Sequence, residues 1–278
     1  MSCNLNLENL PTDVLIQIIR YLDQQSQLEL GLTSKNISYM CMKKLWHTPR
    51  CASVAKLEKW VHTLNNAQTA YPYSTWLIGL DLAFDGTQHV PDSLLIASQQ
   101  QTSLRRLKLH NVQATSAASM ELLHLISCDR TEEIEFLNCS AEITIGFATK
   151  LITGNNKHHK LHTISLLDCY LTDALVSQIV PFTPNLRSFT SQGSGYMSDT
   201  AILAIAEHCP YIENLIVTLP KYIIQSNTIT SISLEALSKC VHLKKLICTG
   251  QVRIASKERE SWLLENSMSL KHCNLSFA

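Results

Sequence analysis

The cysteines are the residues of this sequence whose type could most directly do chemistry, and there are ten of them. A thiolate can act as a nucleophile or bind zinc, and its surroundings decide which of these is possible. The sequence holds no Cys-x-x-Cys pair, which argues strongly against a structural zinc site. A thioester-forming ligase cysteine needs an activating partner, and Cys3, Cys41 and Cys51 have no histidine beside them. We therefore expect neither a zinc site nor a catalytic thiol.

The segment KHHKLH groups His158, His159 and His162 and is the other cluster that could bind a metal ion. Neighbouring side chains of an extended chain point apart, and no carboxylate or thiol at helical spacing completes a ligand set. These histidines are therefore expected on the surface, with no metal and no cofactor. No Gly-x-Ser-x-Gly or His-Glu-x-x-His motif occurs, and eight glycines leave no phosphate-cradling loop. The sequence predicts a protein that is not an enzyme.

Most of the chain follows one recurring pattern, with apolar residues at a starting position and three and five residues after it. Most sets are followed by a helical pattern, and the set from Leu186 is the loosest because Ser191 takes a core position. The starts are Leu77, Leu104, Thr131, Leu161, Leu186, Ile212, Leu243 and Leu270. Successive starts lie 25 to 31 residues apart, which is the period of leucine-rich repeats.

Each repeat is expected to form a short strand and a return helix, with Asp173 and Asp199 near two of the helix starts. Neither element can bury its apolar face alone, whereas stacked neighbours can. The sequence therefore predicts an α/β fold over residues 74–278, a right-handed leucine-rich-repeat solenoid of about eight repeats. Its parallel strands line the concave side and its helices lie outside. The last repeat stops after its strand and is expected to be incomplete, with an open sheet edge.

The cysteines of this region keep the phase of the repeat. Cys139 and Cys169 each lie eight residues after a start, whereas Cys128, Cys209 and Cys240 lie three before the next one. Free cysteine packs as a small apolar residue, and an intracellular chain keeps its thiols reduced. These five cysteines are therefore expected to be buried core residues and not a disulfide framework.

Residues 7–46 form a separate helical pattern ahead of the repeats. Leu10 and Pro11 open a first helix, where the missing N–H of proline costs nothing, and Asp13 complements the positive end of the helix dipole. Two shorter helical patterns follow, the second capped by Thr33 or Ser34. The first helix carries an apolar stripe formed by Val14, Leu15, Ile18, Ile19 and Leu22. So short a chain buries too little surface to be stable alone and needs a partner, or it only covers the end of the repeats.

This segment resembles the F-box family, with its Leu-Pro, its acidic residue, its helix of apolar pairs and its closing Leu-Trp. The segment MSDTAILAIAEHCPYIENLIV likewise resembles the cysteine-containing leucine-rich repeat of many F-box proteins. The resemblance implies a three-helix F-box that binds the Skp-type adaptor of cullin-RING ubiquitin ligases. The implied adaptor-binding residues are Leu10, Pro11, Leu15, Ile18, Ile19, Leu22 and Trp46.

Composition and charge restrict the partners. Lysine and arginine together number 23 and the acidic residues number 23, so no long-range field attracts nucleic acid or an anionic membrane. No run approaches the roughly 20 apolar residues that span a bilayer, and the N-terminus lacks a basic region before an apolar core. We expect a protein of the cytoplasm, the nucleus or both that binds neither nucleic acid nor membrane.

Residues between the core positions of each strand should face outward on the concave side. Basic side chains gather there on the second repeat strand, acidic ones on the third, and two lysines on the seventh. The candidate target-binding residues are Arg105, Arg106, Lys108, Glu133, Glu135 and Lys244. The alternative is that charged side chains on neighbouring strands only pair with each other. Each exposed ion pair would then contribute about 0 to 1 kcal/mol to stability.

Three further segments carry expectations. Residues 47–73 are expected to be a helical linker that joins the two units rigidly, because Trp60 and its apolar neighbours have helical spacing and no Gly/Ser-rich stretch is present. Extra length near 138–148 and 219–230 is expected to project as loops. The second loop would carry an apolar tip at Tyr222 that either folds back or contacts a partner.

The leading hypothesis is a substrate receptor of a Skp-cullin-F-box ubiquitin ligase, in which residues 7–46 hold the adaptor and the repeats hold a protein target. The cullin and RING subunits would join through the adaptor, and the ubiquitin chemistry would be done by other subunits. One alternative is an F-box scaffold that recruits no cullin. Another is a repeat-type interaction or inhibitor module with no ubiquitin role.

Overall fold

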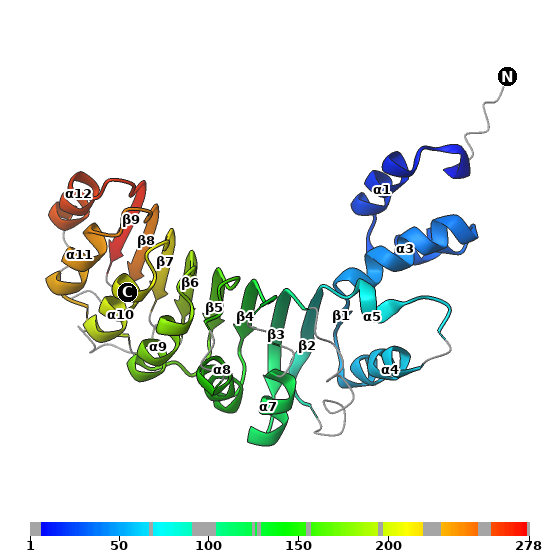
Figure 1. Cartoon of the computed structure of the whole chain (residues 1–278), viewed down its shortest axis with the longest axis horizontal. Helices are drawn as coiled ribbons and strands as arrows, with labels where there is room; N and C mark the ends of the chain where they lie inside the picture. Colours follow the sequence, from blue (N-terminus) through cyan, green and yellow to red (C-terminus); the bar gives the residue numbers. More distant parts are fainter. Residues whose placement is uncertain are drawn as a thin grey trace.

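The computed structural model describes residues 7–66, 69–90, 104–123, 126, 129–153, 157–193, 197–218, 229–249 and 257–276. A helical unit lies at one end of the molecule, and a row of strands and helices extends from it (Figure 1). No helix in these ranges is long and apolar enough to cross a membrane.

Three helices form the helical unit, as the sequence predicts. The elements are η1 (Leu7–Asn9), α1 (Thr12–Tyr21), α2 (Gln24–Gly31) and α3 (Lys35–His47). The Asp23 side chain accepts a hydrogen bond from the N–H of Ser26 and so caps α2. Ser34 caps α3 in the same way, by accepting from the N–H of Ile37. These caps satisfy backbone donors that the first turn of a helix leaves open, which fixes where each helix begins.

The described strands form one parallel sheet of nine strands that follow the order of the chain. They are β1 (Arg50–Cys51), β2 (Gly79–His89), β3 (Arg106–Gln113), β4 (Glu133–Leu137), β5 (Thr163–Leu167), β6 (Ser188–Gln192), β7 (Asn214–Thr218), β8 (Lys245–Thr249) and β9 (His272–Ser276). Each strand from β2 onward begins two residues after a start predicted from the sequence, as Arg106 follows Leu104. The predicted strand positions are therefore confirmed.

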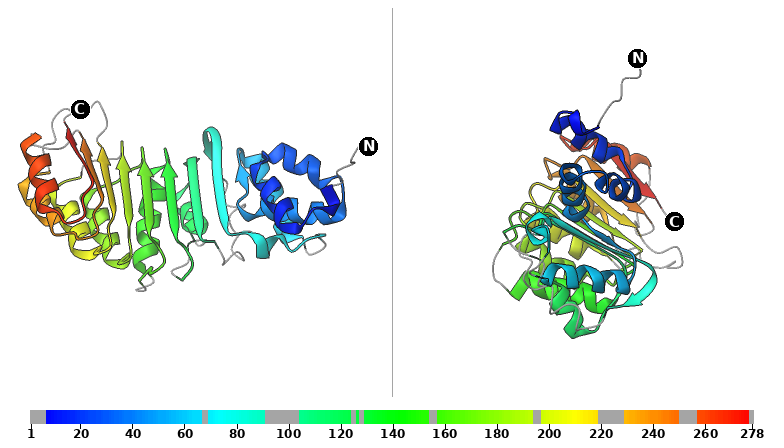
Figure 2. Two further views of the ribbon diagram at one scale, coloured as in Figure 1. Left: turned by 90° about the horizontal axis from the view of Figure 1, so that it is seen from above. Right: turned by 90° about the vertical axis from the view of Figure 1, so that its right-hand side faces the viewer.

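Helices connect the strands and lie together along one side of the sheet, and the strands line the inner side of an open arc (Figures 1 and 2). They are α4 (Val54–Asn65), α5 (Tyr73–Trp76), α7 (Ser116–Leu123), α8 (Ala141–Thr153), α9 (Asp173–Ile179), η2 (Val180–Phe182), α10 (Asp199–His208), α11 (Ser231–Ser238) and α12 (Lys257–Asn266). Parallel strands require such crossovers, because a tight turn can join only antiparallel neighbours.

Two rows of apolar side chains run across the sheet and build its core. Leu107 aligns with Ile134 and then Ile164, so the residues three positions after each start stack on one another. Ser191 aligns with Leu166 and Val217 in the second row and is 1% exposed, so the loosest repeat does place a hydroxyl in the core. Stacking of this kind explains why no single repeat is stable by itself.

The repeat cysteines are core residues, as predicted for those that the structure describes. Cys139, Cys169, Cys209 and Cys240 are all buried, and Cys128 lies outside the described residues. Burial raises the pKa of the Cys209 thiol to about 12, because a thiolate loses its hydration inside the core. The cysteines therefore pack as small apolar groups.

The two segments expected to project as loops are placed differently. Residues 141–153 form the helix α8, whose Phe147 is 1% exposed and packs edge-on against Phe136 with ring centroids 5.4 Å apart. The loop prediction for 138–148 is therefore wrong, because the extra length adds turns to a helix that buries apolar residues. Residues 219–228, with Tyr222, Ile223 and Ile224, lie outside the described residues.

The segment expected as a linker belongs to the sheet. Residues 50–51 form β1, which pairs with β2 through Arg50 opposite Asp81. The helix α4 is present as predicted, and its Leu57 and Trp60 are buried in the same core as the repeats. Residues 47–73 therefore extend the sheet by one short strand and attach the helical unit firmly.

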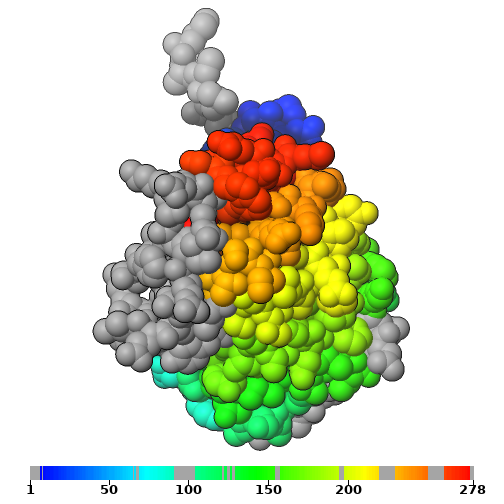
Figure 3. All heavy atoms as spheres, turned by 90° about the vertical axis from the view of Figure 1, so that its left-hand side faces the viewer, coloured from blue at the N-terminus to red at the C-terminus, as the bar shows by residue number. Residues whose placement is uncertain are grey.

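The described part of β9 lies at the far end of the sheet and pairs with β8 on one side. Figure 3 looks onto this end, where the red residues of α12 and β9 form the surface. The N–H of Leu275 donates to the Glu260 carboxylate of α12 at 2.6 Å. This bond supplies a partner to a backbone donor that a strand at an edge otherwise exposes.

Candidate functional site: an apolar groove and a charged inner face

A groove of about 550 Å³ runs between α1 and α3 of the helical unit. Its lining combines apolar and basic side chains: Ile16, Arg20, Tyr39, Met40, Lys43 and Lys44. Ile16 is 36% exposed and Tyr39 is 44% exposed. Large apolar side chains on both walls of an open groove are unusual for a surface that meets only water, so the groove is a candidate binding site for an apolar partner.

More exposed apolar side chains lie on the same helical unit. They are Leu7, Val14, Tyr21, Leu28 and Leu32. Tyr21 and Leu32 are almost fully exposed, at 89% and 86%. The unit therefore keeps an unburied apolar surface after it has packed against the rest of the chain, as expected if a partner completes it.

The charges around the groove are positive. Arg20, Lys43 and Lys44 line it, and no acidic side chain does so among the described residues. Burial, followed by the positive charges of Arg106 and Lys44, lowers the pKa of His47, which also lines the groove. A neutral imidazole avoids adding a further charge to this cluster. A partner with an apolar ridge and acidic margins fits this surface.

The predicted adaptor-binding residues occupy three different places. Pro11 is exposed, and Leu10, Ile18 and Leu22 are partly exposed, so these four remain accessible to a partner. Leu15 and Ile19 are 1% and 2% exposed, and Ile19 packs with Ile37 and Cys41. Both side chains therefore pack the helical unit internally, and Ile19 also forms part of the wall of the groove, so their contact with an adaptor stays a prediction.

Trp46 lies at the junction between the helical unit and the sheet. Its ring stacks on Tyr73 with centroids 4.1 Å apart and lies 6.4 Å from the ring of Trp60. Tyr39 and Trp76 continue the junction with an edge-on contact at 5.1 Å. Stacked aromatic rings therefore hold the two parts of the chain together. Trp46 is only partly buried, so its contact with an adaptor stays a prediction.

Gln27 shapes the helical unit in a way that the sequence did not indicate. Its side chain is buried and donates from Nε2 to the carbonyl oxygens of Ile19 and Leu22, both at 2.9 Å. The last carbonyls of a helix have no partner within the helix, so Gln27 satisfies two of them at the end of α1. A glutamine three residues into the next helix has no sequence signature that distinguishes it from a surface residue.

The charged inner face of the sheet is largely self-paired. Lys108 contacts Glu135 at 2.6 Å, and His110 contacts the same carboxylate at 2.9 Å. Burial acts to raise the pKa of Glu135, but the hydrogen bond and charge of Lys108, followed by those of His110, outweigh it and hold that pKa below its usual value. The alternative expectation, that basic and acidic side chains on neighbouring strands pair with each other, is confirmed for these residues.

Further ion pairs join charged side chains of neighbouring repeats. Arg105 reaches Glu132 at 3.4 Å, and Lys244 reaches Glu213 at 2.6 Å. Arg106 and Glu133 stand opposite each other in the register of β3 and β4, and both are partly exposed. The candidate target-binding residues are thus brought onto one face, but most of their charge is already satisfied.

The inner face changes character toward β8. Ile216 and Ile247 occupy neighbouring positions on β7 and β8 between the core residues, and both are partly exposed. Thr190 precedes them on β6, and Ser165 on β5. The sheet therefore offers charged, then small hydroxyl, then apolar side chains along one row. The alternation rule could have found the two isoleucines, because outward positions of each strand follow directly from its core positions.

The histidine cluster is divided by the fold. His158 is 3% exposed, and its backbone N–H donates to the carbonyl oxygen of Phe182 at 2.7 Å. The prediction of a surface residue is therefore wrong for His158. Burial lowers the pKa of His158, because a charged imidazole is poorly solvated there. His159 is exposed and His162 partly so. The described residues contain no group of three or more His, Cys, Asp or Glu side chains that could hold a metal ion.

Comparison with known proteins identifies the helical unit. Residues 7–52 match the family described as F-box-like. This match supports an F-box protein, a class whose domains generally bind Skp-type adaptors. A search of curated proteins finds none that matches this chain.

Proposed function

We propose that this protein is a non-catalytic substrate-recognition subunit of a Skp-cullin-F-box ubiquitin ligase. The observation that carries the proposal is the F-box-like match of residues 7–52 together with the open apolar groove between α1 and α3. A Skp-type adaptor would fill this groove and the exposed apolar surface around it. Cullin and RING subunits would join through the adaptor, in the cytoplasm or the nucleus.

The repeat region would hold the target. Its regular strand starts, the chain-ordered parallel sheet and the buried cysteines support a leucine-rich-repeat solenoid. The inner face of such an array is wide and varied in chemistry, as a protein-binding surface requires. The charged, hydroxyl and apolar positions along β2 to β8 would set which target is accepted.

The junction between the two units matters for this mechanism. Trp46, Tyr73 and Trp60 stack, and β1 joins the sheet directly, so the groove and the inner face are fixed relative to each other. A receptor that presents a target lysine acts by fixing distance and raising effective concentration. A stiff junction therefore serves the proposed function better than a flexible linker.

Co-purification with a Skp-type adaptor and a cullin tests the proposal. Wild-type protein should bring down both, and Ile16→Asp should bring down neither, because the charge would be buried in the apolar contact. Ile232→Asp is the matched control, since Ile232 is an exposed helical isoleucine in α11 of the repeat region. It should behave as wild type.

Each other outcome has a definite meaning. Adaptor without cullin would favour an F-box scaffold outside a cullin ligase. Neither subunit bound by the folded wild type would favour a repeat module with no ubiquitin role, and would overturn the proposal.

A further inference from the structure

A second hollow lies where the helical unit meets the first strand of the sheet, between α2, α3, β1 and α4. We call it the junction pocket. Its volume is about 240 Å³, and its lining includes Leu28, Met42, Trp46, Arg50, Lys56 and Trp60. No residue lines both the junction pocket and the groove between α1 and α3. The two sites use different sides of α3 and are therefore separate.

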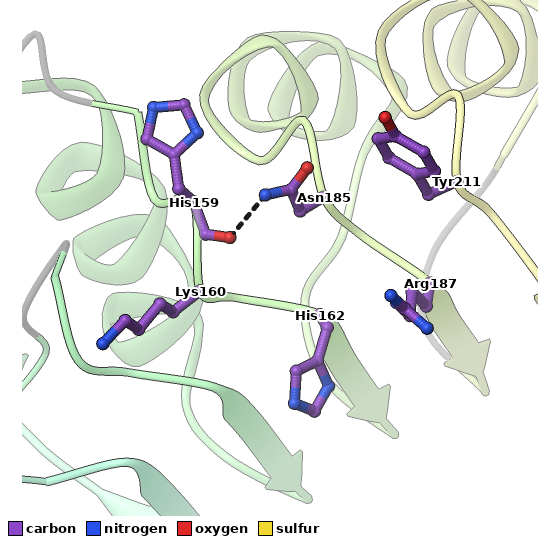
Figure 4. A pocket seen from close by; sticks show the side chains of 6 residues that line it. All are labelled: His159, Lys160, His162, Asn185, Arg187 and Tyr211. Atoms are coloured by element: carbon purple, nitrogen blue, oxygen red, sulfur yellow. Dashed lines mark hydrogen bonds between the residues drawn. The ribbon is translucent and has the colours of Figure 1, made fainter.

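The junction pocket differs in chemistry from the cleft at the rim of the sheet, where β5, β6 and β7 begin (Figure 4). That cleft is lined by His159, Lys160, His162, Asn185, Arg187 and Tyr211, so nitrogen and hydroxyl groups form most of its wall. The junction pocket instead has apolar walls with cations beside them. Such a combination suits a ligand that has both an apolar body and a negative charge.

Aromatic rings and aliphatic side chains form the apolar walls. The rings of Trp46 and Trp60 are nearly parallel, with an angle of 17° between their planes and centroids 6.4 Å apart. Leu28 is 43% exposed although it lines the pocket. Met42 has an unbranched side chain, which adapts its shape to a neighbouring group. An apolar body that enters the pocket would therefore cover side chains that water now contacts.

The cations beside these walls are weakly neutralised. Arg50 pairs with Asp81 at 4.0 Å, the longest separation that counts as an ion pair, and its side chain is 61% exposed. Lys56 lies exposed in the first turn of α4. Burial, followed by the charge of Asp81, raises the pKa of the Cys51 thiol to about 11, so this lining residue adds no negative charge. Within the described part of the chain, no carboxylate lines the pocket.

Trp60 adds a hydrogen-bond donor that has no acceptor. The residue is 6% exposed, and its indole Nε1 is buried without a hydrogen-bond partner among the described residues. Nearly all buried donors in folded proteins have a partner. Lys56 and Trp60 are four residues apart on α4 and so project from the same face of the helix. One carboxylate in the pocket can therefore meet both the ammonium group and the indole N–H.

We infer that the junction pocket binds a small organic acid, that is, a carboxylate on an apolar body. The body would lie against Leu28 and Trp46, and the carboxylate would accept hydrogen bonds from Lys56 and Trp60. Because the indole N–H is closed to water, the ligand reaches it by moving the flexible Met42 side chain. The ligand must be small, since pockets for drug-sized molecules span roughly 300–1,000 Å³. The inference goes beyond the proposed function and does not depend on it.

Titration calorimetry on the full chain tests the inference. The probes are naphthalene-2-carboxylate and octanoate, each compared with its neutral amide. At least one carboxylate should bind saturably, and its amide should bind at least about tenfold more weakly, which corresponds to one charge-assisted hydrogen bond. Binding should also change the tryptophan fluorescence, because Trp46 and Trp60 line the pocket. No saturable binding of either carboxylate at millimolar concentration, or equal binding of acid and amide, would overturn the inference.

Two variants and a matched control locate the site. Lys56→Gln should weaken carboxylate binding by about threefold or more. Lys59→Gln is the control and should leave the affinity unchanged, because Lys59 is exposed on the same helix but does not line the pocket. Trp60→Phe keeps an aromatic ring but removes the N–H, so it should also weaken binding. Circular dichroism checks the fold of Trp60→Phe, and Lys56→Gln changes only an exposed side chain.

Equal effects of Lys56→Gln and Lys59→Gln would contradict the placement of the carboxylate. Competition with a Skp-type adaptor separates this site from the F-box-like groove. A saturating adaptor should leave the affinity for the acid unchanged, and loss of acid binding would show that the pocket belongs to the adaptor-binding surface. A chain that binds adaptor but no acid contradicts this inference alone, and one that binds the acid but no adaptor contradicts the ligase role alone.

Discussion

The carboxylate of Asp168 occupies the space that any side chain at Gly193 would need. A Cβ atom built on Gly193 would lie 1.8 Å from Oδ1 of Asp168, and Gly193 has a φ of 65°. Asn111, Asn138 and Asp168 have left-handed backbones at matching places near the ends of their strands. The left-handed turn therefore recurs near the ends of β3, β4, β5 and β6, and at Gly193 the Asp168 side chain leaves no room for a Cβ atom.

Replacement of Gly193 by alanine should destabilise the protein for two separable reasons. The left-handed backbone costs alanine about 1–2 kcal/mol, and the contact with Asp168 adds about 1–3 kcal/mol of overpacking. Gly86→Ala is the matched control, because Gly86 has a φ of 81° and no atom lies within 4 Å of the place that an alanine methyl group would take. Urea denaturation should show the larger loss for Gly193→Ala. Adding Asp168→Ala should recover part of that loss, and no recovery would contradict the steric explanation.

Replacement of Gln27 by leucine should destabilise the helical unit. The two carbonyl oxygens at the end of α1 would lose their donor inside a buried site, at a cost of about 1–3 kcal/mol. Thermal unfolding followed by circular dichroism measures this change. Gln25→Leu is the control, since Gln25 is exposed and its side chain donates a hydrogen bond to the exposed Glu29. Its expected change is within about 0.5 kcal/mol, and an equal loss in both variants would contradict the capping role.

Leu15 and Ile16 are neighbours in sequence with opposite expected effects. Leu15→Ala should lower the free energy of unfolding by about 2–5 kcal/mol, because it empties a fully buried site. Ile16→Ala should change stability by less than about 1 kcal/mol but weaken adaptor binding by about tenfold. Denaturation and titration calorimetry with a Skp-type adaptor distinguish the two effects. If Ile16→Ala binds the adaptor like wild type, the groove is not the docking surface.

The Asp199 carboxylate joins two repeats and should make the free energy of unfolding depend on pH. Its carboxylate accepts hydrogen bonds from the N–H of Thr230 at 2.8 Å, from the Thr230 hydroxyl at 2.6 Å and from the Ser233 hydroxyl. Burial acts to raise the pKa of Asp199, but the bonds from Ser233 and Thr230 outweigh it and leave that pKa below its usual value. The charged form is therefore favoured by folding.

The sign of the pH effect follows from this lowered pKa. The stabilisation from Asp199 is fully present above the ordinary aspartate pKa and is lost as the pH falls through the lowered, folded-state pKa. Asp199→Asn should thus be less stable than wild type near neutral pH, and the gap should close in acid. Denaturant midpoints measured from neutral to acidic pH provide the test. A gap that stays constant over this range would show that the carboxylate charge is not what stabilises the contact.

Periodicity predicted the fold in detail. The core residues of each repeat, such as Leu107 and Leu109, had to recur because each strand buries its face only against its neighbours. The helix starts near residues 11 and 34 could be predicted, because a proline in the first turn and a serine N-cap are local signals. The start of α2 after Asp23 was not predicted. The self-pairing of Lys108 with Glu135 was also foreseeable, since a fixed repeat length places successive rungs side by side.

The site was less predictable than the fold. An apolar stripe on α1 shows that a helix is amphipathic, but Leu15 turned out to face the interior while Ile16 lines the groove. His158 and His159 differ in the same way, one buried and one exposed. Such choices depend on which neighbouring element covers a side chain. The spacing of residues in the sequence does not show which element covers which side chain.

The sequence by itself determined the repeating strand-and-helix pattern, the separate helical unit in front of it and the absence of any recognised catalytic motif, because these depend on local residue types and spacing. Only the tertiary structure decided that Trp46 joins the two units and that α1 and α3 leave a groove open. The same holds for Arg187 and His162, which line one basic cleft. The physical reason is that burial, charge balance and cavities are properties of several elements packed together.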